Sequence, residues 1–211
     1  MVQKSIPKWL PPAKKQKTSG DHAHTIRRAI RIANNSSPGP DGIPYEAWRV
    51  TKGVDQILFK VLQLLLDDPQ ATENFPEFNE ALLVCLPKKT QAFDPEGNPI
   101  YHPGETRPLA ISNTDNRLIA TTARLRWEDI ANKYVHEHQR GFLPGRSMIQ
   151  NIIDIDRPAH VYACTEDDPA LILFDFTPAF PSIHRDFTQE ALEAFGVPTM
   201  VNNAMTNVLQ K

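Results

Sequence analysis

The side chain best placed for chemistry is that of Asp175, near the end of the most apolar run in the chain. Residues 170–176 are aliphatic or aromatic apart from this aspartate, and such a run predicts a β-strand that is buried on both faces. A carboxylate at the end of a buried strand, beside a turn, can hold a divalent cation against a phosphate group. The alternative is that Asp175 only caps the following turn with hydrogen bonds. Asp175 alone does not decide between the two.

Positive side chains flank a second pair of predicted strands. Residues 81–86 predict a buried strand, and residues 107–111 predict the strand that returns beside it. The two would form a hairpin with a long connecting loop, with Lys88, Lys89 and Arg107 near its edge. An ammonium and a guanidinium group presented together suit phosphate oxygens. For either lysine, a solvated hairpin edge is the alternative.

Helices account for most of the remaining chain. Apolar residues recur at helical spacing, with capping residues where helices start and glycine or proline where they stop. The expected helices cover residues 21–33, 44–48, 54–66, 119–134, 147–155 and 185–195. Helices, hairpin, helices, strand and helix follow one another, which predicts an α+β fold that is rich in helices and has few strands.

Charge is distributed unevenly along the chain. Residues 1–31 contain eight Lys or Arg and one Asp, a charge of +7, so the remaining residues sum to −9 within the total of −2. A basic arm suits a polyanionic partner such as RNA or DNA. For the Pro- and Lys-rich residues 1–19 the alternative is a solvated, disordered leader. Residues 14–17 also fit a nuclear-import patch, a short pattern that is common by chance.

Composition excludes several classes of protein. Two cysteines in 211 residues cannot form a disulfide framework, so an intracellular, reducing compartment is expected. No apolar run reaches membrane-spanning length, and the N-terminus lacks the apolar core of a signal peptide, so no membrane partner is expected. The pairs His22-x-His24 and His136-x-His138 have no cysteine pair nearby, which favours surface histidines over a zinc site.

Four segments follow one another along the chain: SPGPDGIP at 37–44, TRPLAISN at 106–113, GFLPGRS at 141–147 and FDFTPAF at 174–180. In this order and at this spacing, they resemble the reverse transcriptases of non-long-terminal-repeat retrotransposons. The second segment is also similar to group II intron enzymes, and the resemblance covers about residues 36–198. It implies a right-handed polymerase fold, with residues 20–165 as the fingers and residues 166–211 as the beginning of a palm.

The resemblance also implies the roles of single residues at the catalytic centre. The acid that matches Asp175 binds two catalytic Mg²⁺ ions, and the carbonyl oxygen of Phe176 assists it. Lys88 (or Lys89) and Arg107 match basic positions that hold the incoming deoxynucleotide triphosphate. The aromatic residue that matches Phe180, which lies five residues past Asp175, excludes a ribose 2′-hydroxyl; the alternative for Phe180 is a core aromatic.

Two further segments match regions that meet nucleic acid in this family. Gly141, Arg146 and Ser147 match a segment along the RNA or DNA template-primer, and a helix-capping turn with an exposed arginine is the alternative. Residues 38–42 match a finger segment that contacts the template, and a structural turn is the alternative.

The chain departs from the family pattern in two ways. Pro181 stands where the family usually has aspartate, and an aromatic-x-Asp-Asp motif is not found in the 211 residues. Two-metal phosphoryl transfer needs carboxylates from at least two strands, around ions roughly 3.5–4 Å apart. A truncated reverse transcriptase domain that is inactive alone is therefore expected. The alternatives are a non-catalytic nucleic-acid-binding remnant or co-opted module, and an unstable fragment with an exposed, aggregation-prone strand at 170–176.

Overall fold

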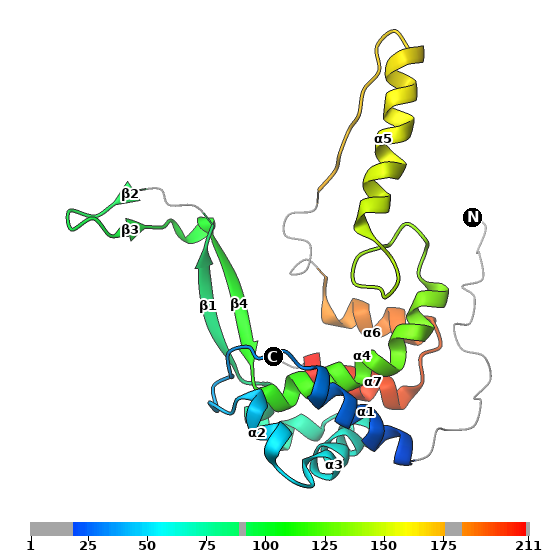
Figure 1. Cartoon of the computed structure of the whole chain (residues 1–211). Helices are drawn as coiled ribbons and strands as arrows, with labels where there is room; N and C mark the ends of the chain where they lie inside the picture. The colour runs from blue at the N-terminus through cyan, green and yellow to red at the C-terminus, as the bar shows by residue number, and fades with distance from the viewer. Residues whose placement is uncertain (1–18, 89–91, 176–182, 210–211) are drawn as a thin grey trace.

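The computed structural model describes residues 19–88, 92–175 and 183–209. Helices form the base of the molecule, and two long projections, a β-ribbon and helix α5, rise from it (Figure 1). The helices are α1 (Ser19–Ile32), α2 (Tyr45–Val50), α3 (Val54–Asp67), α4 (Thr114–Tyr134), α5 (Met148–Thr165), α6 (Arg185–Ala194) and α7 (Thr199–Leu209). The strands are β1 (Ala81–Pro87), β2 (Ala92–Phe93), β3 (Pro99–Ile100) and β4 (Thr106–Ser112), and the 3-10 turns are η1 (Ala71–Asn74), η2 (Pro76–Asn79) and η3 (Pro103–Glu105). The chain is α+β and helix-rich, as the sequence predicts.

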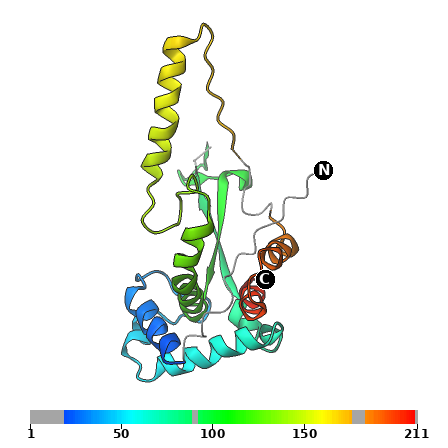
Figure 2. The ribbon, with the colours of Figure 1, turned by 90° about the vertical axis from the view of Figure 1, so that its right-hand side faces the viewer.

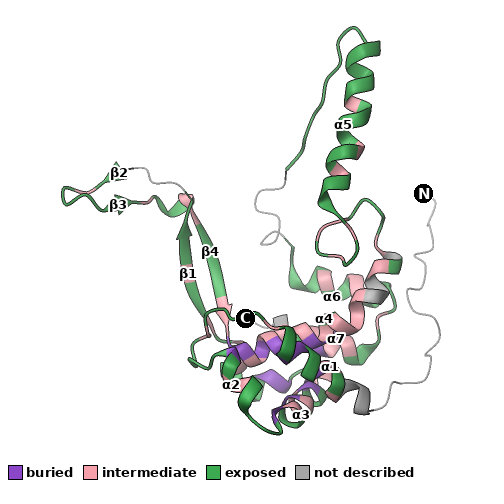
Figure 3. Ribbon diagram, in the orientation of Figure 1, coloured by how far each residue is buried: buried purple, intermediate pink, exposed green. Residues whose placement is uncertain are grey.

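The core lies where α1, α3 and α4 pack on one another and α7 packs on α3. On α3 the apolar residues recur every three or four positions, and the buried ones are Val54, Leu58, Leu62 and Leu65. Residues from α1 and α4 complete this core: Ile26, Ala29, Ile30, Leu118 and Ile119. Each fully buried Leu or Ile contributes about 1.5–3 kcal/mol to folding. The buried residues gather in the base, and both projections are exposed (Figure 3).

Most of the expected helices are confirmed. α1, α2, α3 and α6 begin and end within a few residues of their predicted bounds, and Gly196, just after α6, takes the left-handed conformation (φ 74°) that stops a helix. α4 begins at Thr114, five residues before its predicted start. The Ser147 side chain accepts a hydrogen bond from the N–H of Ile149 and so caps α5, but α5 continues to Thr165 instead of ending near residue 155.

Helix α7 has no counterpart among the sequence-based predictions. It packs against α3 through Asn207, which is fully buried. The Asn207 amide donates to the carbonyl oxygens of Leu65 and Asp68, and its Oδ1 accepts from the backbone N–H of Thr72. The last carbonyl groups of a helix have no partners further along that helix, and Asn207 supplies a donor to one of them, that of Leu65. Residues 199–209 therefore join the core formed by the first half of the chain.

The predicted hairpin is confirmed, but its burial is not. β1 and β4 pair antiparallel from Ala81↔Ser112 to Pro87↔Thr106, and β2 and β3 form a smaller pair beyond them. The strand at 81–86 was expected to be buried, yet Leu83 is 66% exposed. Figures 1 and 2, which are views at right angles, show the reason: the ribbon leaves the helical base, and none of the described helices covers it.

The strand expected at 170–176 is wrong. Residues 171–175 form no strand, and the side chains of Leu173 and Phe174 are 74% and 88% exposed. An extended segment becomes a strand only beside another strand, and none of the described strands lies beside this one. The segment instead runs back along α5, as two views at right angles show (Figures 1 and 2). No helix in the described ranges is long and apolar enough to cross a membrane.

Candidate nucleic-acid interface

Lys88 and Arg107 lie close together at the end of the β1–β4 pair that points away from the helical base. Arg107 is paired with Leu86, and the Lys88 N–H donates to the carbonyl oxygen of Glu105 at 2.8 Å, which continues the β1–β4 register. Residues two apart on a strand share a face, and paired residues share it too. Lys88 and Arg107 therefore lie diagonally across the ribbon on one face, and both are exposed.

The electrostatic character of this ribbon end is positive but not uniformly so. Glu105, the residue opposite Lys88, contributes a carboxylate and is half-buried. In the part of the chain that the structure describes, neither Lys88 nor Arg107 has a salt bridge, so both cations remain available to an anion. Lys89, the alternative to Lys88 in the sequence analysis, lies outside the described residues.

The segment that contains Gly141, Arg146 and Ser147 forms the loop between α4 and α5. Ser147 caps α5, and Gly141 lies beside Met148, whose Sδ atom would be 3.4 Å from a Cβ on the glycine. The Arg146 guanidinium is half-buried and donates to the carbonyl oxygens of Asn132, Val135, His136 and Gln139 and to Oδ1 of Asn132. Arg146 therefore holds the end of α4 and the loop together.

The turn at 36–43 is docked on the start of α4. Asn113, just before α4, accepts a hydrogen bond from the Asp41 N–H through its Oδ1, and the Thr114 hydroxyl donates to the carbonyl oxygen of Ile43. Further along α4, Arg117 donates to Ser36 and Ser37. The first two segments of the sequence resemblance are thus brought into contact, although about 70 residues separate them.

Asp175 lies on the extended segment beside α5 and is exposed. Among the described residues it has no salt bridge, and no group of three or more His, Cys, Asp or Glu is arranged to hold a metal ion. A single carboxylate does not hold a pair of Mg²⁺ ions, so the described residues do not form a complete Mg²⁺ site. Phe176 and Phe180, the other residues expected there, lie outside the described residues.

Helix α4 separates the ribbon from the α4–α5 loop. It starts two residues after β4 ends, and its 21 residues correspond to about 30 Å. Figure 1 shows the ribbon rising near the start of α4 and α5 rising near its other end. The structure therefore brings Lys88 and Arg107 together at one projection, and Gly141, Arg146 and Ser147 together at the foot of the other.

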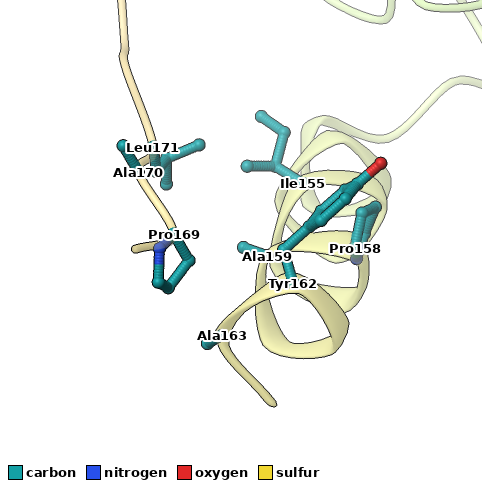
Figure 4. A pocket seen from close by; sticks show the side chains of 8 residues that line it. All are labelled: Ile155, Pro158, Ala159, Tyr162, Ala163, Pro169, Ala170 and Leu171. Atoms are coloured by element: carbon teal, nitrogen blue, oxygen red, sulfur yellow. The ribbon is translucent and has the colours of Figure 1, made fainter. Parts of the chain in front are cut away.

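A cavity of about 440 Å³ lies between α5 and the segment that follows it. Its lining is almost entirely apolar, with Ile155, Pro158 and Tyr162 on the helix facing Pro169 and Leu171 on the segment (Figure 4). Tyr162 carries the one hydroxyl group in the lining, and no charged side chain lines it. This cavity therefore has no groups that would bind phosphate or a metal ion.

Sequence reasoning missed two residues that build these sites. Arg140 pairs with Asp154 at 2.6 Å and donates to Asn151, which fixes the loop to α5. Asn113 holds the 36–43 turn and is 7% exposed. Both belong to the quoted segments or adjoin them, but nothing in the pattern of residue types distinguishes a structural Arg or Asn from one that binds a ligand.

Comparison with known proteins relates the chain to transposable elements. It is 28% identical over 184 residues to the retrovirus-related Pol polyprotein from type-2 retrotransposable element R2DM of Drosophila melanogaster, an alignment that covers 81% of this chain and 15% of that protein. It is 24% identical over 175 residues to the transposon TX1 uncharacterized 149 kDa protein of Xenopus laevis, covering 81% of this chain and 12% of that protein. No family model matches the chain.

These similarities establish a distant relationship to proteins of retroelements. The chain spans only about an eighth to a seventh of the length of these relatives.

Proposed function

We propose that the chain is the fingers, with the beginning of the palm, of an RNA-directed DNA polymerase encoded by a non-long-terminal-repeat retrotransposon. In this proposal residues 20–165 correspond to the fingers and residues 166–211 to the palm. The relationship to retroelement proteins over 81% of the chain and the four ordered segments support it.

The observation that carries the proposal is the position of Lys88 and Arg107 on one face at the end of the ribbon. A point charge and a planar guanidinium, both exposed and without salt bridges among the described residues, suit the oxygens of a triphosphate or of a nucleic-acid backbone. Phe180 would select deoxynucleotides, and Gly141, Arg146 and Ser147 would belong to the surface along the template-primer.

The proposed contribution of this chain is binding. Asp175, with the carbonyl of Phe176, would supply only part of a Mg²⁺ site, and no group of three or more His, Cys, Asp or Glu among the described residues is arranged to hold the ions. This partial Mg²⁺ site favours a second candidate function, a nucleic-acid-binding module without catalysis. The basic residues 1–31 would add to the affinity in either case, because each neutralised phosphate releases a counterion.

Binding to RNA and DNA oligonucleotides, measured by fluorescence anisotropy at several salt concentrations, tests this proposal. We expect the affinity to fall steeply with salt, and Lys88→Gln and Arg107→Gln each to reduce the slope of log K against log[salt] by about one. Lys52→Gln is the matched control, because Lys52 is exposed in the turn between α2 and α3, two helices of the base (Figure 1). Binding that is absent or independent of salt, or slopes that the ribbon variants leave unchanged, would overturn the proposal.

A further inference from the structure

The loop between α4 and α5 is held by an arginine whose hydrogen-bonding capacity is fully used. A guanidinium has five N–H donors. In Arg146, Nε donates to Oδ1 of Asn132 at 2.8 Å, Nη1 donates to the carbonyl oxygens of His136 and Gln139 at 2.6 and 2.8 Å, and Nη2 donates to those of Asn132 and Val135 at 2.7 and 3.0 Å. All five donors are satisfied within the protein, so none remains for a phosphate.

The rest of the loop is fixed at both ends. Asn132 on α4 donates to the carbonyl oxygen of Pro144, and Arg140 pairs with Asp154 on α5 at 2.6 Å. The Arg140 side chain is only 14% exposed, so this ion pair is shielded from solvent better than a surface pair. The loop therefore has a defined shape without any partner.

This fixed loop presents one aromatic side chain. Phe142 is 97% exposed, and it adopts a φ of +62°, the left-handed conformation that is unfavourable for a residue with a bulky side chain. Gly145 in the same loop also has a positive φ, of 74°, which costs glycine little, whereas the positive φ at position 142 falls on a phenylalanine. A strained backbone persists where the surrounding contacts determine it, and such positions cluster at functional sites.

We propose that Phe142 is a platform on which an unpaired base of single-stranded RNA or DNA stacks, and that Arg146 is the residue that positions it and does not bind phosphate. This inference rests on the proposed nucleic-acid-binding function. A fully exposed ring can offer its face to a base, and because the loop is already fixed, little conformational entropy is lost on binding. The loop residues before it, His136, Glu137, His138 and Gln139, are polar and exposed, which suits a nucleotide better than an apolar protein groove.

The test uses short single-stranded oligonucleotides that contain 2-aminopurine, whose fluorescence is quenched when it stacks on an aromatic ring. We expect Phe142→Leu to weaken binding by about 5- to 150-fold, the range for losing one stacked base. The salt slope should not change, because no charge is removed. Phe187→Leu is the matched control, since Phe187 is 65% exposed on α6.

Two further variants separate stacking from folding and positioning from phosphate binding. Phe142→Gly should lose binding as Phe142→Leu does while keeping or raising the melting temperature, because glycine accepts the positive φ. Arg146→Lys keeps the charge but cannot make the five hydrogen bonds of the guanidinium. Compared at a temperature at which circular dichroism shows both proteins folded, it should lose the 2-aminopurine quenching at saturation and keep the wild-type salt slope.

The outcomes distinguish this proposal from the function on which it rests. Binding by the wild type that Phe142→Leu leaves unchanged overturns the stacking platform alone. Unchanged quenching and affinity in Arg146→Lys, together with a slope reduced by about one in Arg146→Ala, would assign Arg146 to phosphate. Absence of any binding by the wild type overturns both proposals.

Discussion

A Cβ atom on Gly39 would lie 2.3 Å from Oδ1 of Asn113 and 2.5 Å from the backbone N and Cα of the same residue. The turn at 36–43 therefore approaches the start of α4 so closely that only glycine fits at this position. The contact joins two segments of the sequence resemblance, and the Asp41 N–H donates to the same Oδ1 at 3.2 Å.

We expect Gly39→Ala to lower the free energy of unfolding by about 1–3 kcal/mol, because the clash is with backbone atoms that no side-chain rotation relieves. Urea denaturation followed by circular dichroism measures it. Gly104→Ala is the control: its Cβ would meet only the His102 side chain at ordinary contact distance, so we expect a change within about 0.5 kcal/mol. Equal midpoints for the two variants would contradict the close approach.

Asn207 provides a second prediction about stability. Asn207→Ala would remove three hydrogen bonds from a buried site, those to the carbonyl groups of Leu65 and Asp68 and the one from the N–H of Thr72. A hydrogen bond of this kind contributes about 1 kcal/mol net, so we expect a loss of about 3 kcal/mol in the free energy of unfolding.

The control for this prediction is Asn203→Ala on the same helix. Asn203 is half-buried and donates to the carbonyl oxygen of Leu66, so we expect a loss of about 1 kcal/mol. If both variants unfold at the same denaturant concentration, α7 is not held by Asn207.

Asp115 makes stability depend on pH. Burial, and to a smaller degree the nearby Asp41 carboxylate, raise the pKa of Asp115, which lies in the first turn of α4. The folded chain then binds a proton more tightly than the unfolded chain, so ionisation of this group lowers stability as pH rises from the ordinary aspartate pKa to the folded pKa.

We therefore expect Asp115→Asn to be more stable than the wild type at pH 7, with a difference that shrinks as pH falls and disappears below about pH 4. Denaturation at a series of pH values measures this. A stability difference for Asp115→Asn that is constant with pH would show that burial of this carboxylate has no energetic consequence.

Catalysis provides the last prediction. In a primer-extension assay with Mg²⁺ and deoxynucleotide triphosphates, we expect the purified chain to make no template-dependent product, because a two-metal site needs more carboxylates than Asp175. Template-dependent products that Asp175→Asn abolishes would refute this expectation and would place a complete catalytic centre in these 211 residues.

The sequence predicts the helical elements well because one physical signal determines them. The spacing of Val54, Leu58, Leu62 and Leu65 defines both the existence of α3 and its buried face. The ribbon is predicted for a similar reason, since two short β-prone runs flank a turn-rich segment. The covering of a strand is a property of the whole fold, so the exposure of Leu83 could not be foreseen from its apolar character.

The failures have equally specific causes. α7 was not predicted because its buried residues include Asn202 and Asn207 as well as Ala204, so its buried face is not marked by apolar residues alone. The run at 170–176 has strand propensity but no described partner strand, and propensity does not supply one. The role of Arg146 could not be assigned from the sequence, because the residue type does not show whether its guanidinium is fully hydrogen-bonded within the protein or free to bind phosphate.

Helix α4 works as a spacer between the two arms of the molecule, because the ribbon precedes it and the loop with Phe142 follows it. A continuous helix resists stretching, so the separation of the arms is set by the number of residues between Thr114 and Tyr134. Four alanines inserted into α4 would lengthen it by about 6 Å and rotate one arm relative to the other by about 40°. If the proposed nucleic-acid binding involves both arms, the polymer would then meet them out of phase, and the length of α4 would set the stretch that the chain engages at once.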